Sequence, residues 1–358
     1  MAPGKPPTHS KSPTGSNVKN VVLGDLLFKT WYQSIYPEDL VAKDTDRLYV
    51  CRWCFRYSCD VDAYVKHTRV CDNKASPPGT KVYEHSGYSI WEVDGEEHKL
   101  FAQNLSLFAK LFLDHKSVFF DVASFLFYLL TFSDPNDTQN QDCRILGYFS
   151  KEKMSWDANN LACILIFPPY QHKQLGKLLM GVSYKLSGWE GDGGLIGSPE
   201  RPLSEMGWRS YSRFWEERVA RYLLLGSQRQ DSEETQLQQQ DITSHTTTTP
   251  EGSKRRHSTE SMTVREMGLA VGMLAEDIIT ALKSMGVVEP EKSQKKRKAH
   301  QPHSPDTNTG ADHGVQTVKM RKSTVLEWAK AHRVALQDPV REDGFLGKWA
   351  PKSPHEGP

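Results

Sequence analysis

The sequence predicts an α/β fold, and three observations support this prediction. Residues 161–167 form an apolar run of strand length that Pro168 and Pro169 close. From Leu175 the apolar residues recur with a helical period, so a strand, a tight loop and a helix follow one another. The 358 residues are 37% apolar with a mean hydropathy of -0.59, which indicates a globular centre diluted by polar segments.

The amino-terminal residues 1–17 are rich in Pro, Ser, Lys and Gly, so we expect them to be disordered. No apolar run approaches transmembrane length, and the first residues lack the apolar core of a signal peptide. We therefore expect a soluble, unsecreted protein without a membrane partner. Six unevenly spaced cysteines indicate reduced thiols, metal ligation or chemistry rather than a disulfide framework.

A metal-binding motif comes next, with the spacing Cys51-x2-Cys54-x12-His67-x3-Cys71. Three thiolates and one imidazole at this spacing can surround one tetrahedral Zn2+, so we predict a zinc finger over 51–71. Residues 64–69 are predicted as the short helix that carries His67, and Cys59 lies off the ligand spacing. Zinc modules often contact DNA. Because there is only one finger and its helix is short, we favour a structural role, in which metal loss costs folding.

The loop after the strand at 161–167 is a candidate anion site. The N-terminus of the following helix offers unpaired N–H groups and the positive end of the helix dipole, which favour a pyrophosphate. The pattern Gln171-x-x-Gln174-x-Gly176 is poor in glycine, so an ordinary strand–turn–helix is an equally good interpretation of this segment alone.

The carboxyl-terminal part alternates between polar and apolar segments. Residues 227–260 are rich in Gln, Ser and Thr and are expected to be a disordered insertion, whereas helical periodicity returns over 261–288. Residues 289–322 are again polar and basic and are expected to be a second disordered insertion, and the aromatic segment 323–358 is expected to pack on the main domain. The basic runs 254–256 and 295–298 suit a solvated linker, a nuclear import signal or non-specific contact with DNA phosphates.

Three motifs occur in order in the centre of the chain: Ala162-Cys163-Ile164-Leu165, Pro168-Pro169-Tyr170-Gln171, and Gly197-Ser198-Pro199-Glu200-Arg201-Pro202-Leu203-Ser204. With these motifs the chain resembles the MYST family of histone acetyltransferases. Further blocks that resemble the family extend the likeness over residues 20–225. They are residues 30–32, 36–38, 77–79, 103–105, 111–116 and 147–152.

The resemblance implies a GNAT-like acetyltransferase core with a mixed sheet at 99–226. A C2HC zinc finger lobe at 18–98 would be stapled to this core, and 261–288 with the tail would form a helix-turn-helix-like lobe. It also implies acetyl-CoA as cosubstrate, a structural Zn2+, a nuclear location, accessory subunits, and a nucleosomal histone tail, that of histone four, as substrate. The short layout resembles the something-about-silencing branch of fungal proteins, with the essential fungal histone-four acetyltransferases as the alternative.

Acetyl transfer to lysine needs a base, because a free lysine with a pKa of about 10.4 is almost wholly protonated near neutral pH. Glu200 is the candidate, since it follows a rigid Gly-Ser-Pro turn and matches the family's catalytic glutamate. Cys163 is either a small buried residue that lines the acetyl pocket or, as proposed for the family, a transient acetyl carrier. We favour direct attack by the lysine amine. Lys116 matches the lysine that the family autoacetylates.

The resemblance also implies which residues bind the cofactor. Two of them depart from the family pattern: Gln174 replaces a glycine and His172 replaces an arginine. A non-glycine residue at a positive φ costs on the order of 1 kcal/mol or more, so affinity for coenzyme A would fall. A family serine is Arg213 here, which could itself reach a phosphate. The expected cofactor-binding residues are Ile164, Leu165, Ile166, Gln171, His172, Lys173, Gln174, Leu175, Gly176, Lys177 and Ser204.

Two other function classes stay open at this point. Gln174 in the cofactor loop suits a catalytically inactive scaffold, and the finger with the basic runs suits a DNA-binding regulator. Acetyl transfer to histones separates the three hypotheses.

Overall fold

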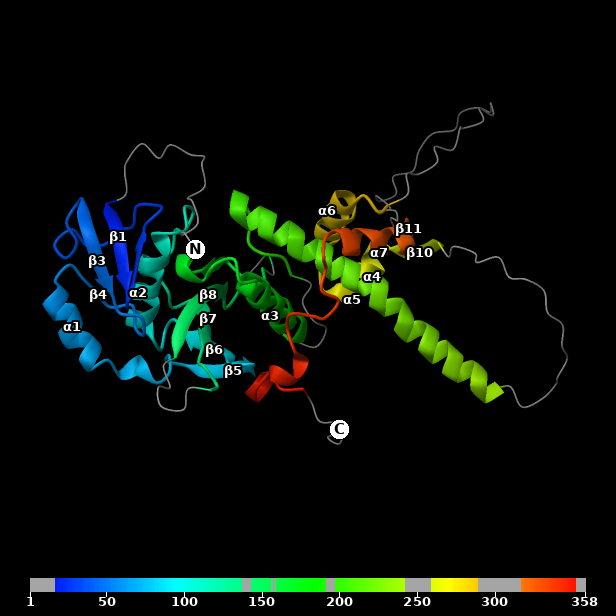
Figure 1. Cartoon of the computed structure of the whole chain (residues 1–358), viewed down its shortest axis with the longest axis horizontal. Coiled ribbons are helices and arrows are strands. Elements are labelled where there is room, and N and C mark those ends of the chain that lie inside the picture. Colours follow the sequence, from blue (N-terminus) through cyan, green and yellow to red (C-terminus); the bar gives the residue numbers. More distant parts are fainter. Residues whose placement is uncertain are drawn as a thin grey trace, which may run out of the picture. The chain divides into compact units, whose positions relative to one another are not determined.

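The computed structural model describes residues 17–136, 143–155, 157, 159–190, 197–241, 259–288 and 317–351 (Figure 1). These residues divide into two compact units. Unit 1 contains the described residues up to Trp208 together with those from Asp338 onward, and unit 2 contains those from Arg209 to Gln337. Among the helices described, none combines the length and apolar character needed to cross a membrane.

The centre of unit 1 is a five-stranded antiparallel sheet in the order β5-β6-β7-β8-β9. Its middle strands β7 and β8 are buried along most of their length, because helices cover both faces. Tyr148 and Leu165, which pair across β8 and β9, pack with the helix α2, whereas Lys151 on the opposite face bonds to Ser187 of α3. The elements are β5 (Thr80–His85), β6 (Tyr88–Asp94), α2 (Lys99–Lys110), β7 (Phe125–Phe132), β8 (Arg144–Glu152), β9 (Cys163–Ile166) and α3 (Leu175–Trp189).

The first four strands of the chain form a second sheet in unit 1, with the order β2-β1-β3-β4. Its β1 and β3 are parallel and the other neighbours are antiparallel, so this sheet is mixed. The finger helix α1 follows, and Asp60 caps it by accepting a hydrogen bond from the backbone N–H of Asp62 at 2.8 Å. The elements are β1 (Val18–Leu23), β2 (Leu26–Lys29), β3 (Thr45–Val50), β4 (Tyr57–Ser58), α1 (Val61–Arg69) and the short helix η1 (Asp72–Lys74).

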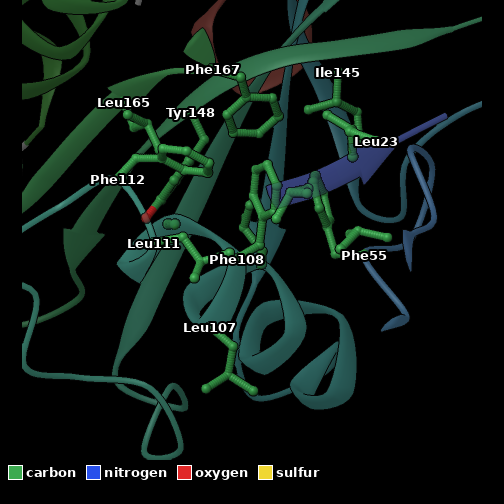
Figure 2. Close-up of a cluster of buried hydrophobic side chains, with 14 of the residues drawn as sticks. Leu23, Phe55, Leu107, Phe108, Leu111, Phe112, Ile145, Tyr148, Leu165 and Phe167 are labelled. Atoms are coloured by element: carbon green, nitrogen blue, oxygen red, sulfur yellow. The ribbon is translucent and has the colours of Figure 1, made fainter. Parts of the chain in front are cut away.

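One hydrophobic cluster joins the two sheets of unit 1 (Figure 2). Leu23 comes from the first sheet, Phe108 from α2, and Tyr148 and Leu165 from the second sheet. Phe55, from the loop between β3 and β4, belongs to this cluster and is 1% exposed. The residues before and after position 98 therefore share one core.

Unit 2 is a helical body with a small ribbon. The helices α5 and α6 pack together across a turn at Gly272, where the backbone φ of +64° suits glycine. The strands β10 and β11 are antiparallel, and Val288 forms a further bridge with Met320. The elements are α4 (Glu205–Asp241), which begins in unit 1, β10 (Thr259–Thr263), α5 (Val264–Val271), α6 (Ala275–Met285), β11 (Thr317–Arg321) and α7 (Lys322–Ala331).

The fold class agrees with the sequence prediction, but several expected boundaries differ. The strands β5 and β6 belong to the core sheet, although residues up to 98 were assigned to the finger lobe. The helix α4 continues to Asp241, where a disordered insertion was expected from residue 227. The tail also divides: α7 belongs to unit 2, whereas the residues from Asp338 belong to unit 1. The strands β10 and β11 also begin within the expected insertions 227–260 and 289–322, because the two segments pair with each other as an antiparallel ribbon. The rest of the expected disorder, at 1–16, 242–258 and 289–316, lies outside the described residues.

Candidate metal centre and active site

The four predicted metal ligands come together in unit 1. The ligand atoms of Cys51, Cys54, His67 and Cys71 all lie within 4.8 Å of one another. The Cys51 and Cys71 sulfurs are 3.8 Å apart, and the Cys54 sulfur is 3.1 Å from Nε2 of His67. The predicted short helix is confirmed, because α1 carries His67 in its last turn. Cys59 is exposed and stays outside the cluster.

This donor set fits zinc. A tetrahedral Zn2+ with Zn–S bonds of about 2.3 Å separates two ligand sulfurs by about 3.8 Å, close to the separation of Cys51 and Cys71. The pKa of the Cys51 thiol is lowered to about 5, chiefly by a hydrogen bond from Cys54, while burial opposes this and backbone N–H groups of Trp53 and Cys54 add to it. The loop therefore favours the thiolate at Cys51 alone. The pKa of Cys54 is raised, chiefly by its hydrogen bond with Cys51, and that of Cys71 is raised chiefly by burial, so a bound Zn2+ would supply the charge that stabilises these two thiolates.

The loop between the first two cysteines also connects the finger to the core. Phe55 has a backbone φ of +61° and donates its N–H to the Cys51 carbonyl at 2.9 Å. Its ring centroid lies 5.5 Å from Phe108 and 5.8 Å from Phe167. Because a core residue belongs to the metal loop itself, the geometry supports the structural role of the finger over a DNA-reading role.

The turn that carries Glu200 is tied to the residues just before β9. Leu161 and Pro199 form a parallel bridge, and the Glu200 N–H donates to the Leu161 carbonyl at 2.9 Å. The Asn160 N–H donates to the Ser198 carbonyl at 3.0 Å. These bonds hold the backbone of Glu200 beside the strand that begins at Cys163.

The Glu200 side chain is exposed, yet its environment disfavours the charged form. Its carboxyl pKa is raised above the ordinary glutamate value, first by burial and then by the negative charges of Glu152 and Asp157. A carboxylate that is reachable from solvent and has a raised pKa is suited to accept a proton from an incoming amine.

Two polar groups that the sequence did not connect with Cys163 interact electrostatically with its thiol. Lys116 is 7% exposed, and its pKa is lowered by burial while the interaction with Cys163 opposes this. The Tyr148 hydroxyl is buried, and no hydrogen-bond partner for it is found in the described part of the chain. Burial and then Cys163 raise its pKa well above the ordinary tyrosine value. The local sequence around Cys163 offers no positive charge, but the fold supplies one from Lys116.

The loop after β9 has the backbone geometry that the sequence predicted as costly. Gln174 has a φ of +62°, and His172 has a φ of +63°. The Gln171 side chain donates to the Ile166 carbonyl at 2.8 Å and fixes the start of the loop. A Cβ added to Gly176 would meet no atom within 4 Å, so the first turn of α3 is open to an approaching group. The first N–H groups of a helix have no intrahelical acceptor, and this opening therefore fits an anion such as a pyrophosphate.

The structure places the other expected contact residues as follows. Ser204 lies at the start of α4, where its hydroxyl accepts the Gly207 N–H at 3.1 Å. In unit 2 the Arg213 guanidinium bonds to Glu217 at 2.8 Å and to the His332 carbonyl at 2.7 Å. Its suggested role as a phosphate ligand is therefore replaced by a structural one. The basic runs at 254–256 and 295–298 lie outside the described residues.

A Cys3His finger, an α/β core with an open helix N-terminus, and a glutamate held beside the start of β9 define a zinc-finger protein with an acetyltransferase fold. Residues 76–324 match the model of the MOZ/SAS family, and residues 16–71 match that of the MYST family zinc finger domain. The chain therefore belongs to the MOZ/SAS, or MYST, family.

Curated relatives agree with this assignment. Histone acetyltransferase MOF of Drosophila melanogaster is 38% identical over 277 residues, which cover 77% of this chain and 28% of the relative. Histone acetyltransferase of the MYST family 1 of Arabidopsis thaliana is 37% identical over 286 residues, 80% of this chain and 55% of the relative. The Tip60 homolog of Caenorhabditis elegans is 35% identical over 269 residues, 75% of this chain and 50% of the relative. The chain spans about half or less of these relatives.

Proposed function

We propose that the chain is a lysine acetyltransferase that transfers the acetyl group of acetyl-CoA to histone tails. The observation that carries this proposal is the pairing of the Glu200 turn with the residues that lead into β9, which puts a carboxyl group of raised pKa beside the start of the strand that carries Cys163. Membership of the MYST family supports it, since relatives are named histone acetyltransferases.

Acetyl-CoA supplies an activated acetyl group as a thioester. Glu200 accepts the proton of the substrate ammonium, so that the neutral amine attacks the acetyl carbonyl. The new C–N bond forms as the C–S bond breaks, coenzyme A leaves as the thiolate, and the second proton of the attacking nitrogen passes to that thiolate. The first N–H groups of α3 and the loop 171–174 bind the pyrophosphate, and Lys173 and Lys177 add positive charge. Cys163 lines the acetyl pocket, and Lys116 beside it is the proposed site of self-acetylation. That modification would remove a buried charge next to Cys163.

The proposed substrate, cellular location and partners follow from the same proposal. The Drosophila, Arabidopsis and nematode relatives are all named as acting on histones, which supports a nucleosomal histone tail and a nuclear location for this chain. We retain histone four as the proposed tail, accessory subunits as partners, and non-specific DNA contact through the basic runs.

The experiment that tests the proposal is incubation of the purified chain with nucleosomes and acetyl-CoA, followed by mass-spectrometric mapping of acetylated lysines. We expect acetylation of a histone tail and of Lys116. Absence of any transfer, with acetyl-CoA binding intact, would instead support an inactive scaffold. One observation favours that second function, namely the strained loop at His172 and Gln174.

The strain in this loop gives a direct prediction for cofactor affinity. An L-residue in the left-handed region costs roughly 1–2 kcal/mol, and glycine avoids this cost. We therefore expect Gln174→Gly to lower the Kd for acetyl-CoA by up to about tenfold, since 1.4 kcal/mol corresponds to a factor of ten. The branched variant Gln174→Val should raise the Kd. Isothermal titration calorimetry measures both changes.

The control is Ser86→Gly, since Ser86 also has a positive φ of +52° but lies in the turn between β5 and β6, outside the proposed cofactor-binding residues. This change relieves the same kind of strain away from the cofactor loop, so it should leave the Kd for acetyl-CoA unchanged. Weaker binding by Gln174→Gly would show that the loop strain does not limit cofactor affinity.

The pH dependence of acetyl transfer should change when the charged neighbours that raise the Glu200 pKa are removed. The base must be ionised, so activity is lost as the pH falls through its raised pKa. Glu152→Gln removes a negative charge that raises this pKa, and we expect the acid limb of the kcat/KM profile to move to lower pH. Asp157→Asn should move it in the same direction by less, because Glu152 is the larger cause. An acid limb that stays in place in both variants would mean that another group titrates.

A further inference from the structure

The described residues after unit 2 form a strap, which we define as 338–351. It contains the short helices η3 (Glu342–Gly344) and η4 (Gly347–Trp349) and belongs to unit 1. In Figure 1 this red segment lies beside β5. The chain therefore leaves unit 1 at Trp208 and returns to it at Asp338.

The strap is fixed to the edge of the core sheet. Phe345 forms an antiparallel bridge with Tyr83 of β5, and the Leu346 N–H donates to the Val82 carbonyl at 2.9 Å. The Tyr83 hydroxyl accepts the Arg341 N–H at 3.3 Å. Lys348 bonds to Glu92 of β6 at 2.7 Å. The strap thus continues the hydrogen bonding of the sheet past β5.

The same strap follows one face of α3. Val340 packs against Gly181, Glu342 pairs with Lys185, and the Phe345 ring centroid lies 4.6 Å from that of Trp189. The three α3 positions are spaced by four residues, so they share one face of the helix over roughly 12 Å of its axis. The strap residues meet them in the same order along the chain. α3 is therefore held between the core sheet and a strap that is itself bonded to that sheet.

The contact at Gly181 is too close for any side chain. A Cβ at this position would lie 2.5 Å from Cγ2 of Val340, which is 3% exposed. Either the strap or α3 would have to move to admit a methyl group, because packed interiors transmit such strain. Gly181 is thus a position where only glycine leaves room for the strap against the helix.

We propose that the strap positions α3 for cofactor binding, with Val340 and Glu342 as positioning residues. This inference rests on the proposed function, since it assumes that the N-terminus of α3 binds the pyrophosphate of acetyl-CoA. The strap contacts the carboxyl-terminal part of α3, from Gly181 to Trp189. The open turn at Gly176 lies at the amino-terminal end of the same rigid helix. A shift of the helix moves the N–H groups away from the phosphates without touching Glu200. The strap should therefore affect cofactor affinity more than the chemical step.

The test is a compensation experiment on full-length chain. Gly181→Ala should raise the KM for acetyl-CoA and its Kd about tenfold, with kcat within about twofold, because a displacement well below 1 Å already costs binding geometry. Val340→Ala in the same chain removes the clashing methyl groups and should restore most of the affinity. A merely structural role would lower the melting temperature without such a selective change in KM.

A charge reversal gives an independent measurement if Gly181→Ala does not fold. Lys185→Glu and Glu342→Lys should each raise the Kd for acetyl-CoA, and the double reversal should return it toward the original value. An unchanged Kd in the single variants, or no recovery in either double variant, overturns the inference while the wild-type chain still binds acetyl-CoA and acetylates histones. A wild-type chain that binds no acetyl-CoA overturns the proposed function as well.

Discussion

Glu200→Gln is expected to lower kcat/KM for histone acetylation by about 10²- to 10⁴-fold, the range that a positioned general base contributes. The amide keeps the size of the side chain but cannot accept the proton of the substrate ammonium. The loss should appear in kcat rather than in the KM for acetyl-CoA, because the cofactor loop at 171–177 is unchanged. Steady-state kinetics with a histone peptide measures both constants.

The variant should remain folded, because the sign of the pKa shift at Glu200 favours the neutral side chain. A carboxyl whose pKa is raised in the folded state contributes stability below its unfolded pKa, and this contribution is lost as the pH rises through the folded pKa. At neutral pH the charged form is therefore disfavoured by the fold, and the neutral amide removes that effect. Glu38→Gln is the matched control, since Glu38 lies in an exposed pair with Lys43. Retained activity in Glu200→Gln would exclude Glu200 as the base.

Local sequence patterns were sufficient for the parts of the site that depend on spacing. The finger ligands lie within one short segment, so Cys51 and Cys54 on one tight loop and His67 on a helical turn could be placed without knowledge of the fold. The loop after β9 is a similar case, because the family's glycine at the position of Gln174 pointed to a possible positive φ, and Gln174 has a φ of +62°. In each case neighbours along the chain determine the geometry.

Contacts between distant segments could not be predicted in this way. Lys116 reaches Cys163 only because α2 packs on the face of the sheet that carries Cys163, and no local pattern records that packing. The sequence predicts that the segment 323–358 packs on the core, but it does not predict that this segment divides between the two units at residue 338. Asp338 returns to the core while the preceding α7 stays in unit 2, because Phe345 pairs with an edge strand more than 250 residues earlier. The boundary expected at residue 98 is wrong for the same reason, because β5 and β6 pair with strands of the core that lie later in the sequence.

Loss of a zinc ligand is expected to unfold the finger and to destabilise the whole of unit 1. Cys51→Ser removes one of four ligands from a structural site whose metal binding is worth on the order of 10 kcal/mol in isolated fingers. The effect should spread because Phe55, within the metal loop, packs against Phe101, Phe108 and Phe167. Removal of a buried phenylalanine alone costs about 3–5 kcal/mol, a large part of a typical domain's stability.

Three measurements separate this coupling from a local defect. Cys59→Ser is the matched control, since Cys59 is exposed and lies outside the ligand cluster, so zinc content and thermal unfolding should be unchanged. Chelation of the wild-type chain should lower the melting temperature of the entire unit and abolish transfer. Phe55→Ala should lower the melting temperature while it leaves the four ligands in place. If the metal-free chain instead kept its core melting transition, the finger would be an independent module, and the role of Phe55 as the connection between metal and core would be wrong.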